Sequence, residues 1–540
     1  MENCYFRAEG ILACSSSPSK EIKGNQLLTP KHPYMRVASI NWPLIRHTCG
    51  KLLLLEALFL LSACGVSLYY YFQLGERDFV PLLVPTVVCT LLGYGLLERR
   101  PLLSLRVTQR EGLLIVSGMW IVFSLIGMIP YLLAGTCHSL CDAFLETMSG
   151  FTTTGCTVLD NIDAQPHGIL YWRSLTQWMG GLGIVVFSLA MLPRIEPGTV
   201  QMFSAEVTGV SFEKLHPRIQ DTSRTLWFIY IGLTLLCAML YVEGGMTLFD
   251  AVNHAMTTLA TGGFSTHQAS LGWYHSAFIE LVCTLFLLIA SVNFSLYYMV
   301  RHWHFSQFWR NEELRWFLYI VLGFTALFLL FFYVVPSGSV LTPEQTESMP
   351  MDFADRLRAS LFHVTTIIST CGFQGEYYDY QLWGRIFWLP TLIIMALGGC
   401  AGSTAGGFKI QRLVILIKNL KAVAHQQAEP RSFGSVIIDR QVLRHELLQR
   451  TLAFLFLFIL VSLVCMSVLI LQGYDLTTAL GTTISAIGNC GPGLGQTGPA
   501  FTWSSLPDLS KWVLSFTMLI GRLEIFTFLM LFTRSFWRRW

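Results

Sequence analysis

The chain has 540 residues, of which 53% are hydrophobic and only 13% are charged. Its mean hydropathy is +0.53, and its formal net charge is only +3. This composition excludes a soluble globular protein and indicates an integral membrane protein whose surroundings are the lipid bilayer. We expect no nucleic-acid partner.

Residues 1–50 are polar, and no apolar core precedes Lys51. We therefore expect a cytoplasmic N-terminal extension rather than a secretory signal peptide. Residues 51–110 then contain two apolar segments, near 52–73 and 80–97, which are long enough to cross a bilayer. We predict that they are two extra transmembrane helices in front of the rest of the fold.

The remaining chain repeats one pattern four times, in residues 111–224, 225–315, 316–450 and 451–540. Each repeat has an apolar span, a short semi-polar segment, a glycine-containing loop and a second apolar segment. The first spans lie near 111–135, 225–242, 316–335 and 451–471, and the second segments near 170–193, 276–300, 385–421 and 511–533. With the two extra helices this makes ten predicted spans. A period of this size indicates repetition of whole substructures.

The four loops align on one glycine each: Gly155, Gly263, Gly372 and Gly491. The short segments before them lie near 142–154, 250–262, 358–371 and 477–490. Thirteen residues form about 20 Å of helix, which is too short for a bilayer core of about 30 Å. Non-helical backbone at membrane depth is tolerated only where protein buries it or where it lines water. Four half helices that end in such loops indicate a shared aqueous axis.

The residue types of the loops fit a potassium filter, in which backbone carbonyl oxygens replace the hydration shell of the ion. Glycine reaches positive φ and so lets carbonyl groups turn inward. No loop residue is charged, whereas divalent-cation and anion pores use rings of charged side chains. The partly negative C-terminal ends of the half helices also favour a cation. The alternative, that the glycines only allow close helix packing, explains one loop better than four matched ones.

Three residues from each loop are the predicted ion-binding residues of this filter. They are Thr153, Thr154, Gly155, Thr261, Gly262, Gly263, Thr370, Cys371, Gly372, Asn489, Cys490 and Gly491.

The distribution of positive charge predicts the orientation in the membrane. The connections 98–110, 194–224, 301–315, 409–450 and 534–540 hold 22 of the 36 Lys and Arg residues, and those on the other side hold five. The positive-inside rule places the first set, and with it both termini, in the cytoplasm. The four glycine loops then enter the membrane from outside.

Two positive charges lie within predicted spans. Arg173 stands beside aromatic residues at the outer start of its span, and we favour an interfacial anchor there over a functional role. Arg522 lies about eleven residues into its span, a depth at which a charge normally faces the bundle interior or a water-filled path. We therefore predict that Arg522 faces the pore, with a buried structural ion pair to Glu524 as the alternative.

The second segment of repeat three is interrupted by five glycines in the ten residues 398–407. Because each glycine weakens a helix by up to about 1 kcal/mol, we predict a break that forms a flexible intramembrane loop and gates the pore below the filter. The alternative is a simple kink. The predicted gate residues are Gly398, Gly399, Gly402, Ser403, Thr404, Gly406 and Gly407, with Arg522 nearby. The charged connection 409–450 that follows is a candidate contact for a cytoplasmic partner.

Several of these motifs resemble the TrkH/KtrB family of potassium-uptake proteins. They are Ser149-Gly150-Phe151-Thr152-Thr153-Thr154-Gly155, Thr176-Gln177-Trp178-Met179-Gly180-Gly181-Leu182-Gly183, Ala260-Thr261-Gly262-Gly263-Phe264-Ser265-Thr266 and Gly398-Gly399-Cys400-Ala401-Gly402-Ser403-Thr404-Ala405-Gly406-Gly407. The resemblance covers about residues 52–540. The two extra spans and Gly521-Arg522-Leu523-Glu524 make it closer to TrkH.

The resemblance implies four degenerate helix–loop–helix units around one pore, a homodimer, a location in the bacterial inner membrane and a cytoplasmic nucleotide-binding regulatory subunit of the TrkA type. The expected fold is thus an all-α integral membrane protein with four pseudo-symmetric helix–pore-loop–helix repeats around one pore, preceded by two extra transmembrane helices. The loops keep one aligned glycine each instead of T-V-G-Y-G. We therefore expect a preference for potassium that is weaker than that of a full filter.

Three classes of function remain open at this point. The first is a gated, channel-like pore for potassium, and the second is a potassium transporter coupled to sodium or proton symport, for which Glu56 and Glu524 are the few acidic candidates. The third, a membrane enzyme, lacks a nucleophile–base pair or a metal cluster, so we expect no enzyme. No covalent cofactor is expected, and potassium is the substrate. The sequence has no G-x-x-x-x-G-K-[ST] motif, so a nucleotide acts only through a partner.

Overall fold

The computed structural model describes residues 40–97, 108–183, 219–301, 305–334, 350, 352–377, 379–430, 436–439 and 441–537. Most of the predicted N-terminal extension and parts of the predicted cytoplasmic connections, residues 1–39, 98–107 and 184–218, lie outside this set. The described residues belong to one compact unit, Ile40–Arg538. They are mainly helical, as predicted, and their only described strands are β1 (Ile437–Ile438) and β2 (Gln441–Val442), which form an antiparallel pair.

Within the described part of the chain, six helices are long and apolar enough to cross a membrane. They are α1 (Trp42–Leu74), α2 (Phe79–Leu96), α3 (Gln109–Gly127) with its continuation α4 (Ile129–Leu133), α9 (Ile219–Glu243), α14 (Glu312–Val334) and α19 (His445–Leu471). Their length and composition bear out the prediction of an integral membrane protein.

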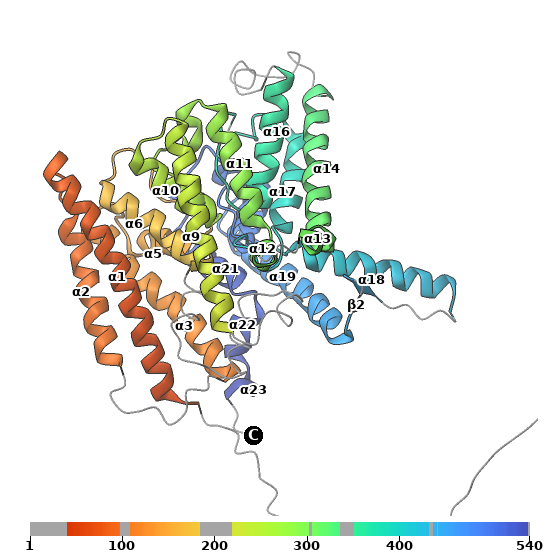
Figure 1. The fold of residues 1–540 in the computed structure, drawn as a ribbon, viewed down its shortest axis with the longest axis horizontal. Coiled ribbons are helices and arrows are strands. Elements are labelled where there is room, and N and C mark those ends of the chain that lie inside the picture. Colours follow the sequence, from red (N-terminus) through yellow and green to blue (C-terminus); the bar gives the residue numbers. More distant parts are fainter. Residues whose placement is uncertain are drawn as a thin grey trace, which may run out of the picture. The chain divides into compact units, whose positions relative to one another are not determined.

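The helices α1 and α2 lie side by side at one edge of the helical bundle (Figure 1). Helix α1 begins at Trp42, well inside the predicted extension 1–50, because the side chain of Asn41 accepts a hydrogen bond from the backbone N–H of Leu44. The backbone N–H of Asn41 in turn donates to Glu111 on α3 at 2.7 Å. This polar contact joins the start of the α1–α2 pair to the start of the first repeat.

Four short helices occupy the places of the predicted half helices. They are α5 (Leu140–Phe151), α10 (Leu248–Leu259), α16 (Phe353–Ile368) and α20 (Leu476–Gly488). The side chains of Ser139, Thr247 and Asp475 cap the starts of α5, α10 and α20, which satisfies backbone N–H groups that have no partner within the helix. Each helix ends three or four residues before its aligned glycine, so the four loops begin at nearly equivalent places.

The second segment of every repeat is broken, whereas we predicted a break only in the third. Helix α6 (His167–Trp178) passes into a π-helical turn η1 (Met179–Gly183), and α11 (Ala277–Ser291) is separated from α12 (Phe294–Arg301). Helix α17 (Trp388–Leu397) is followed by a loop and then by α18 (Ile410–Ala428). Helix α21 (Asp508–Arg522) meets α22 (Phe526–Leu529) and η6 (Met530–Phe532) at a bend of 107°.

The prediction of an uninterrupted span in repeats two and four is therefore wrong. In repeat one the helical axis is disturbed from Met179, and the predicted remainder, 184–193, lies outside the described residues. The cause in repeat one is Gly181, which has a non-helical ψ of −121°. In repeat two Asn293 uses its side chain to accept from the N–H of Ser295 at 2.9 Å, which competes with continuation of the helix.

The remaining described helices are short. They are α13 (Phe305–Arg310), α23 (Arg534–Trp537) and the 3-10 turns η3 (Ser270–Tyr274), η4 (Arg385–Phe387) and η5 (Gly495–Thr497). Helix α18 lies against α14 and α19 and projects from the bundle (Figure 1).

Candidate functional site

The four glycine loops share one backbone conformation. The aligned glycines have φ of +83°, +79°, +76° and +98° for Gly155, Gly263, Gly372 and Gly491. Two residues earlier, Thr153, Thr261, Thr370 and Asn489 also have positive φ, between 53° and 56°. Positive φ is uncommon for a residue with a Cβ atom and strained for a β-branched one. Its recurrence at four equivalent places shows that the loops are copies of one local structure.

A matching set of backbone hydrogen bonds ties each loop to its half helix. The N–H of the residue before the glycine donates to the carbonyl oxygen six positions before the glycine in all four cases. These bonds are Thr154 to Ser149 and Gly262 to Thr257 at 2.9 Å, and Cys371 to Thr366 and Cys490 to Ser485 at 3.0 Å. The loop residues of each repeat are therefore held by the half helix that directly precedes them in the chain.

The four loops contact one another in a closed cycle. A Cβ atom on Gly155 would collide with the carbonyl oxygen of Gly262 in the second loop, and one on Gly263 would collide with that of Cys371 in the third. A Cβ on Gly372 would collide with the carbonyl oxygen of Cys490 in the fourth loop. The cycle closes because a Cβ on Gly491 would lie only 2.7 Å from the carbonyl oxygen of Thr154 in the first loop.

This cycle brings the twelve predicted filter residues together at one place, which we call the glycine ring. Each aligned glycine stands against the carbonyl group that precedes the next aligned glycine, so no side chain fits at any of the four positions. The requirement for glycine is thus both steric and conformational.

A cavity of about 290 Å³ opens onto the ring, and all four aligned glycines line it. Residues that follow the glycines complete its wall, among them Asp163, Arg173, His267 and Trp503. We call this cavity the vestibule. Nδ1 of His267 pairs with Asp163 at 2.6 Å, and Nε2 lies 3.7 Å from a carboxylate oxygen of Asp250. Burial lowers the pKa of His267, but its hydrogen bonds with Asp250 and Asp163 outweigh burial and raise it above its usual value.

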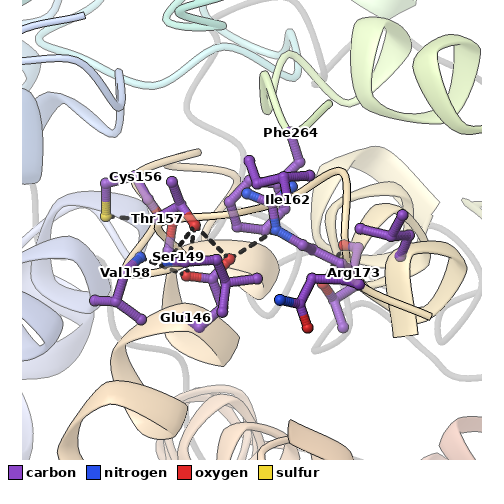
Figure 2. A network of polar contacts seen from close by, with 12 residues as sticks. Glu146, Ser149, Cys156, Thr157, Val158, Ile162, Arg173 and Phe264 are labelled. Carbon is purple, nitrogen blue, oxygen red and sulfur yellow. Dashed lines mark hydrogen bonds and ion pairs between the residues drawn. The ribbon is translucent and has the colours of Figure 1, made fainter. Parts of the chain in front are cut away.

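Arg173 is buried, with 2% of its surface exposed, so the favoured prediction of an interfacial anchor is wrong. Its Nε donates to Glu146 at 2.7 Å, and its Nη1 donates to the carbonyl oxygen of Ser265 at 2.8 Å. Figure 2 shows Glu146 and Arg173 together with Phe264, whose ring centroid lies 3.6 Å from the guanidinium carbon. A buried guanidinium needs such partners because removal from water is costly.

The sequence reasoning missed Gln177, and it predicted Asn489 as a filter residue without foreseeing the contacts of its side chain. The amide of Gln177 on α6 donates to the carbonyl oxygen of Gly262 at 2.7 Å and accepts from the N–H of Phe264 at 3.0 Å. The amide of Asn489 donates to Thr154 in the first loop at 3.0 Å and to Met518 on α21 at 2.9 Å. The sequence did contain a signal for Gln177, because this glutamine lies inside the predicted apolar segment near 170–193. A buried amide needs hydrogen-bond partners.

The side chain nine residues before each aligned glycine is polar and buried in all four half helices. These residues are Glu146, His254, His363 and Thr482. Nε2 of His254 bonds Ser265 at 2.8 Å, Nε2 of His363 bonds Thr391 at 3.0 Å, and the hydroxyl of Thr482 bonds Thr497 at 2.6 Å. The polar side chains at this position therefore bond residues that follow the half helix in the same repeat.

The loop 398–407 between α17 and α18 is the predicted gate region, and its helix break is present. Gly398, Gly402 and Gly407 have φ of +70°, +73° and +79°, which glycine allows at little cost. The ends of the loop close on each other, since a Cβ on Gly398 would collide with Gly406, and one on Gly399 would lie 2.7 Å from Ala405. The break is a compact folded loop rather than a kink.

This loop contacts the ring directly. The N–H of Gly406 donates to the hydroxyl of Thr370 at 2.6 Å, and a Cβ on Gly406 would collide with the carbonyl oxygen of Gly488. Thr370 and Gly488 precede the aligned glycines of loops three and four, whereas the vestibule is lined by those glycines and the residues after them. The loop and the vestibule therefore lie against different parts of the ring.

Arg522 ends α21 and joins two of the helix breaks. Its Nη1 donates to the carbonyl oxygen of Thr404 at 2.8 Å, and its Nη2 donates to those of Gly180 and Gly181 at 2.6 and 3.2 Å. Arg522 and Ser403 remain partly exposed, while Thr404 is buried. Glu524 forms an ion pair with Arg412 in the first turn of α18. The guanidinium of Arg522 thus joins one carbonyl group of the predicted gate, that of Thr404, to the π-helical turn of repeat one.

An acidic residue, Glu313, also bonds the loop 398–407. The carboxylate of Glu313, near the start of α14, accepts a hydrogen bond from the N–H of Ala401 at 2.6 Å. The hydroxyl of Thr404 donates to the carbonyl oxygen of Ala290 at 3.1 Å, and the N–H of Cys400 donates to that of Ser291 at 2.9 Å. Three neighbouring helices, α11, α14 and α21, therefore fix the loop in place.

Comparison with known proteins identifies relatives along most of the chain. The family model TrkH, described as a cation transport protein, matches residues 86–539. The Trk system potassium uptake protein TrkH of Halomonas elongata is 37% identical over 435 residues, which cover 80% of this chain and 86% of that protein. The Trk system potassium uptake protein TrkG of Escherichia coli is 33% identical over 498 residues, which cover 92% and 98%.

A solved structure agrees with this relationship. The crystal structure of the potassium transporter TrkH from Vibrio parahaemolyticus superposes with a TM-score of 0.80 at 32% sequence identity, covering 92% of this chain and 100% of that one. The chain therefore belongs to the TrkH family of cation transport proteins.

Proposed function

We propose that this chain takes up potassium across the bacterial inner membrane through a gated, channel-like pore, with the glycine ring as its selectivity filter. The observation that carries the proposal is the closed cycle of four aligned glycines against four carbonyl groups. An ion in such a ring is coordinated by oxygen atoms from four loops, which is the arrangement that replaces the hydration shell of potassium. The relatives named above are potassium uptake proteins by description.

The charges around the ring support a cation as the substrate. No residue of the ring is charged, and four half helices end at it with the partly negative ends of their dipoles. The positive charge of Arg173 at the vestibule is paired with Glu146, so it opposes cation entry little. In this proposal the vestibule is the outer entrance, and the four repeats are arranged pseudo-symmetrically around one pore.

The loop 398–407 is the gate in this proposal. It contacts the ring at Thr370 and lies beside Arg522, so it occupies the path that an ion follows after the filter. Broken helices in membrane proteins usually line the transport path. Movement of the loop away from Arg522 would then open the pore to the cytoplasm.

A cytoplasmic partner has a direct route to this gate, because α18 follows the loop after two residues. Lys418 on α18 pairs with Glu312 at 2.5 Å and donates to the carbonyl oxygen of Ile437 at 2.6 Å. Asp439 accepts from the N–H of Glu312 at 2.8 Å, one residue before Glu313. We propose that a nucleotide-binding regulatory subunit acts on this segment of a homodimer. Regulation that survives deletion of residues 424–436 would contradict this part.

Coupled symport with sodium or a proton is the second candidate. It is favoured by Glu56, which is fully buried between α1 and α2 and has a carboxylate oxygen without a hydrogen-bond partner. Acidic groups at membrane depth often mark proton pathways. A strict requirement for sodium or for a proton gradient would support this candidate over a pore.

The test is rubidium influx into liposomes that contain the purified chain and are loaded with potassium. We expect influx that external potassium blocks, that external sodium barely reduces, and that Gly263→Asp abolishes. Influx that is unchanged by Gly263→Asp would overturn the proposed pore.

A further inference from the structure

We propose that the buried ion pair between Glu146 and Arg173 positions the first two loops of the glycine ring and thereby determines how strongly the ring discriminates potassium from sodium. Neither residue touches the ion in this proposal; both act through the loop backbone. The inference rests on the proposed filter function of the ring.

Glu146 bonds the first loop just after its aligned glycine. Its carboxylate accepts from the hydroxyl of Thr157 at 3.0 Å and from the N–H of Val158 at 2.9 Å (Figure 2). Thr157 is two residues beyond Gly155. Glu146 itself is fully buried, so these bonds form where water does not compete for them.

Arg173 bonds the second loop at the equivalent place. Its Nη1 donates to the carbonyl oxygen of Ser265 at 2.8 Å, and its guanidinium stacks on Phe264. Ser265 is two residues beyond Gly263. Because Nε of the same guanidinium bonds Glu146 at 2.7 Å, the ion pair connects the first loop at Thr157 and Val158 with the second loop at Ser265.

No other pair of loops shows this kind of connection among the polar residues at the matching position. His254, His363 and Thr482 stand nine residues before their glycines, as Glu146 does, and their described side-chain hydrogen bonds stay within their own repeats. The seam between loops one and two, where Gly155 meets Gly262, is thus held by a charged pair. Repeats two and three are also joined by an ion pair, between Glu280 and Arg358 at 3.3 Å, but Glu280 bonds loop three at Glu376, four residues beyond Gly372.

The spacing of this seam matters for selectivity. The preference of an oxygen cage for potassium depends on its size, or on the number and field strength of its carbonyl groups. A seam that relaxes by a few tenths of an ångström changes both. Loss of the pair should therefore change the ratio of potassium to sodium affinity rather than only the amount of folded protein.

The experiment measures rubidium influx into liposomes and the concentrations of external potassium and sodium that halve it. Glu146→Gln removes the charge, and Arg173→Lys keeps the charge but replaces the fork with a single ammonium group that cannot bond Glu146 and Ser265 in the same geometry. Thr157→Val removes one hydrogen bond and leaves the ion pair intact. The selectivity ratio is the external sodium concentration that halves influx divided by the external potassium concentration that does so. We expect this ratio to fall about tenfold in Glu146→Gln and Arg173→Lys, and less in Thr157→Val.

Asp142→Asn is the matched control. Asp142 lies one turn before Glu146 on α5 and forms its own ion pair with Lys511 at 2.6 Å, farther along the chain from the ring. This variant should lower thermal stability and keep the wild-type ratio. A change as large as that of Glu146→Gln would overturn the inference, because it would show that any lost ion pair on α5 alters selectivity.

The remaining outcomes also decide the question. A wild-type ratio in folded Arg173→Lys and Thr157→Val overturns the positioning role, even if Glu146→Gln does not fold. If Arg173→Lys keeps the wild-type ratio of half-blocking sodium to potassium concentrations while Glu146→Gln changes it, only the charge of the pair matters. That result also overturns the positioning role. Absence of rubidium influx in the wild-type protein, or influx that persists in Gly263→Asp, defeats the proposed pore itself and is recognised separately.

Discussion

Replacing Arg522 by glutamine should raise ion uptake by the chain in the absence of any partner. The described hydrogen bonds of Arg522 reach carbonyl groups of the loop 398–407 and of the π-helical turn of repeat one. A hydrogen bond to a charged group contributes about 1.5–3 kcal/mol. If the bond to Thr404 is made only while the loop blocks the pore, its loss shifts the equilibrium toward the open state by roughly tenfold to a hundredfold.

The assay is the initial rate of rubidium influx into liposomes with the partner omitted. Arg522→Lys keeps the charge but cannot bond both broken segments at once, so it should fall between the wild type and Arg522→Gln. Lys421→Gln, at an exposed site on α18, is the control and should behave as the wild type. Uptake in folded Arg522→Gln that stays at or below the wild-type rate would refute the role of this residue in closing the pore.

Three further predictions concern other contacts of the site. Glu313→Leu leaves the N–H of Ala401 buried without its hydrogen-bond partner, which costs about 1–3 kcal/mol. Amide hydrogen exchange of residues 398–407 should therefore become faster and ion uptake should rise. An unchanged exchange rate would contradict this role of Glu313. Asn489→Asp tolerates the positive φ but loses the donor to Thr154 and Met518, so the unfolding temperature and influx should both fall, and a wild-type unfolding temperature would count against it. Because the pKa of His267 is raised in the folded protein, the stability that its charged form contributes is complete below the ordinary histidine pKa of 6.5 and is lost as pH rises through the folded pKa. The unfolding temperature between about pH 6 and about pH 9 should therefore depend on pH less in His267→Gln than in the wild type or in the exposed control His138→Gln. Equal pH dependence in all three proteins would exclude a contribution of His267 to stability.

The half helices and the aligned glycines could be predicted from the sequence for physical reasons. Each loop needs a residue without a Cβ atom at one place, and the short segment before it is bounded by a polar cap such as Ser139 and by the glycine. These signals are local. The break at 398–407 was equally visible, because five glycines in ten residues leave little helix propensity.

Features that depend on distant partners could not be predicted. Arg173 stands beside aromatic residues in the sequence, but its burial depends on Glu146, 27 residues away, and on Ser265, 92 residues away. Thr153, Thr261 and Thr370 have low intrinsic preference for positive φ, so only the closed ring explains their conformation. The break in repeat two lies in an apolar segment that hydropathy alone does not distinguish from an intact span. The break in repeat four follows Gly521-Arg522-Leu523-Glu524, where we interpreted the charge of Arg522 as pore-facing and not as the end of a helix.

The central claim is that four equivalent glycines form one ion-selective ring, and alanine at each of them tests it most directly. Gly155→Ala, Gly263→Ala and Gly372→Ala should each abolish selective rubidium influx, because the new Cβ collides with a carbonyl group of the next loop. Gly491→Ala should be the mildest of the four, since its Cβ would have 2.7 Å to the nearest oxygen. Gly118→Ala, where a Cβ meets nothing within 4 Å, should leave influx and selectivity unchanged. Selective influx that survives any of the first three substitutions would contradict the account.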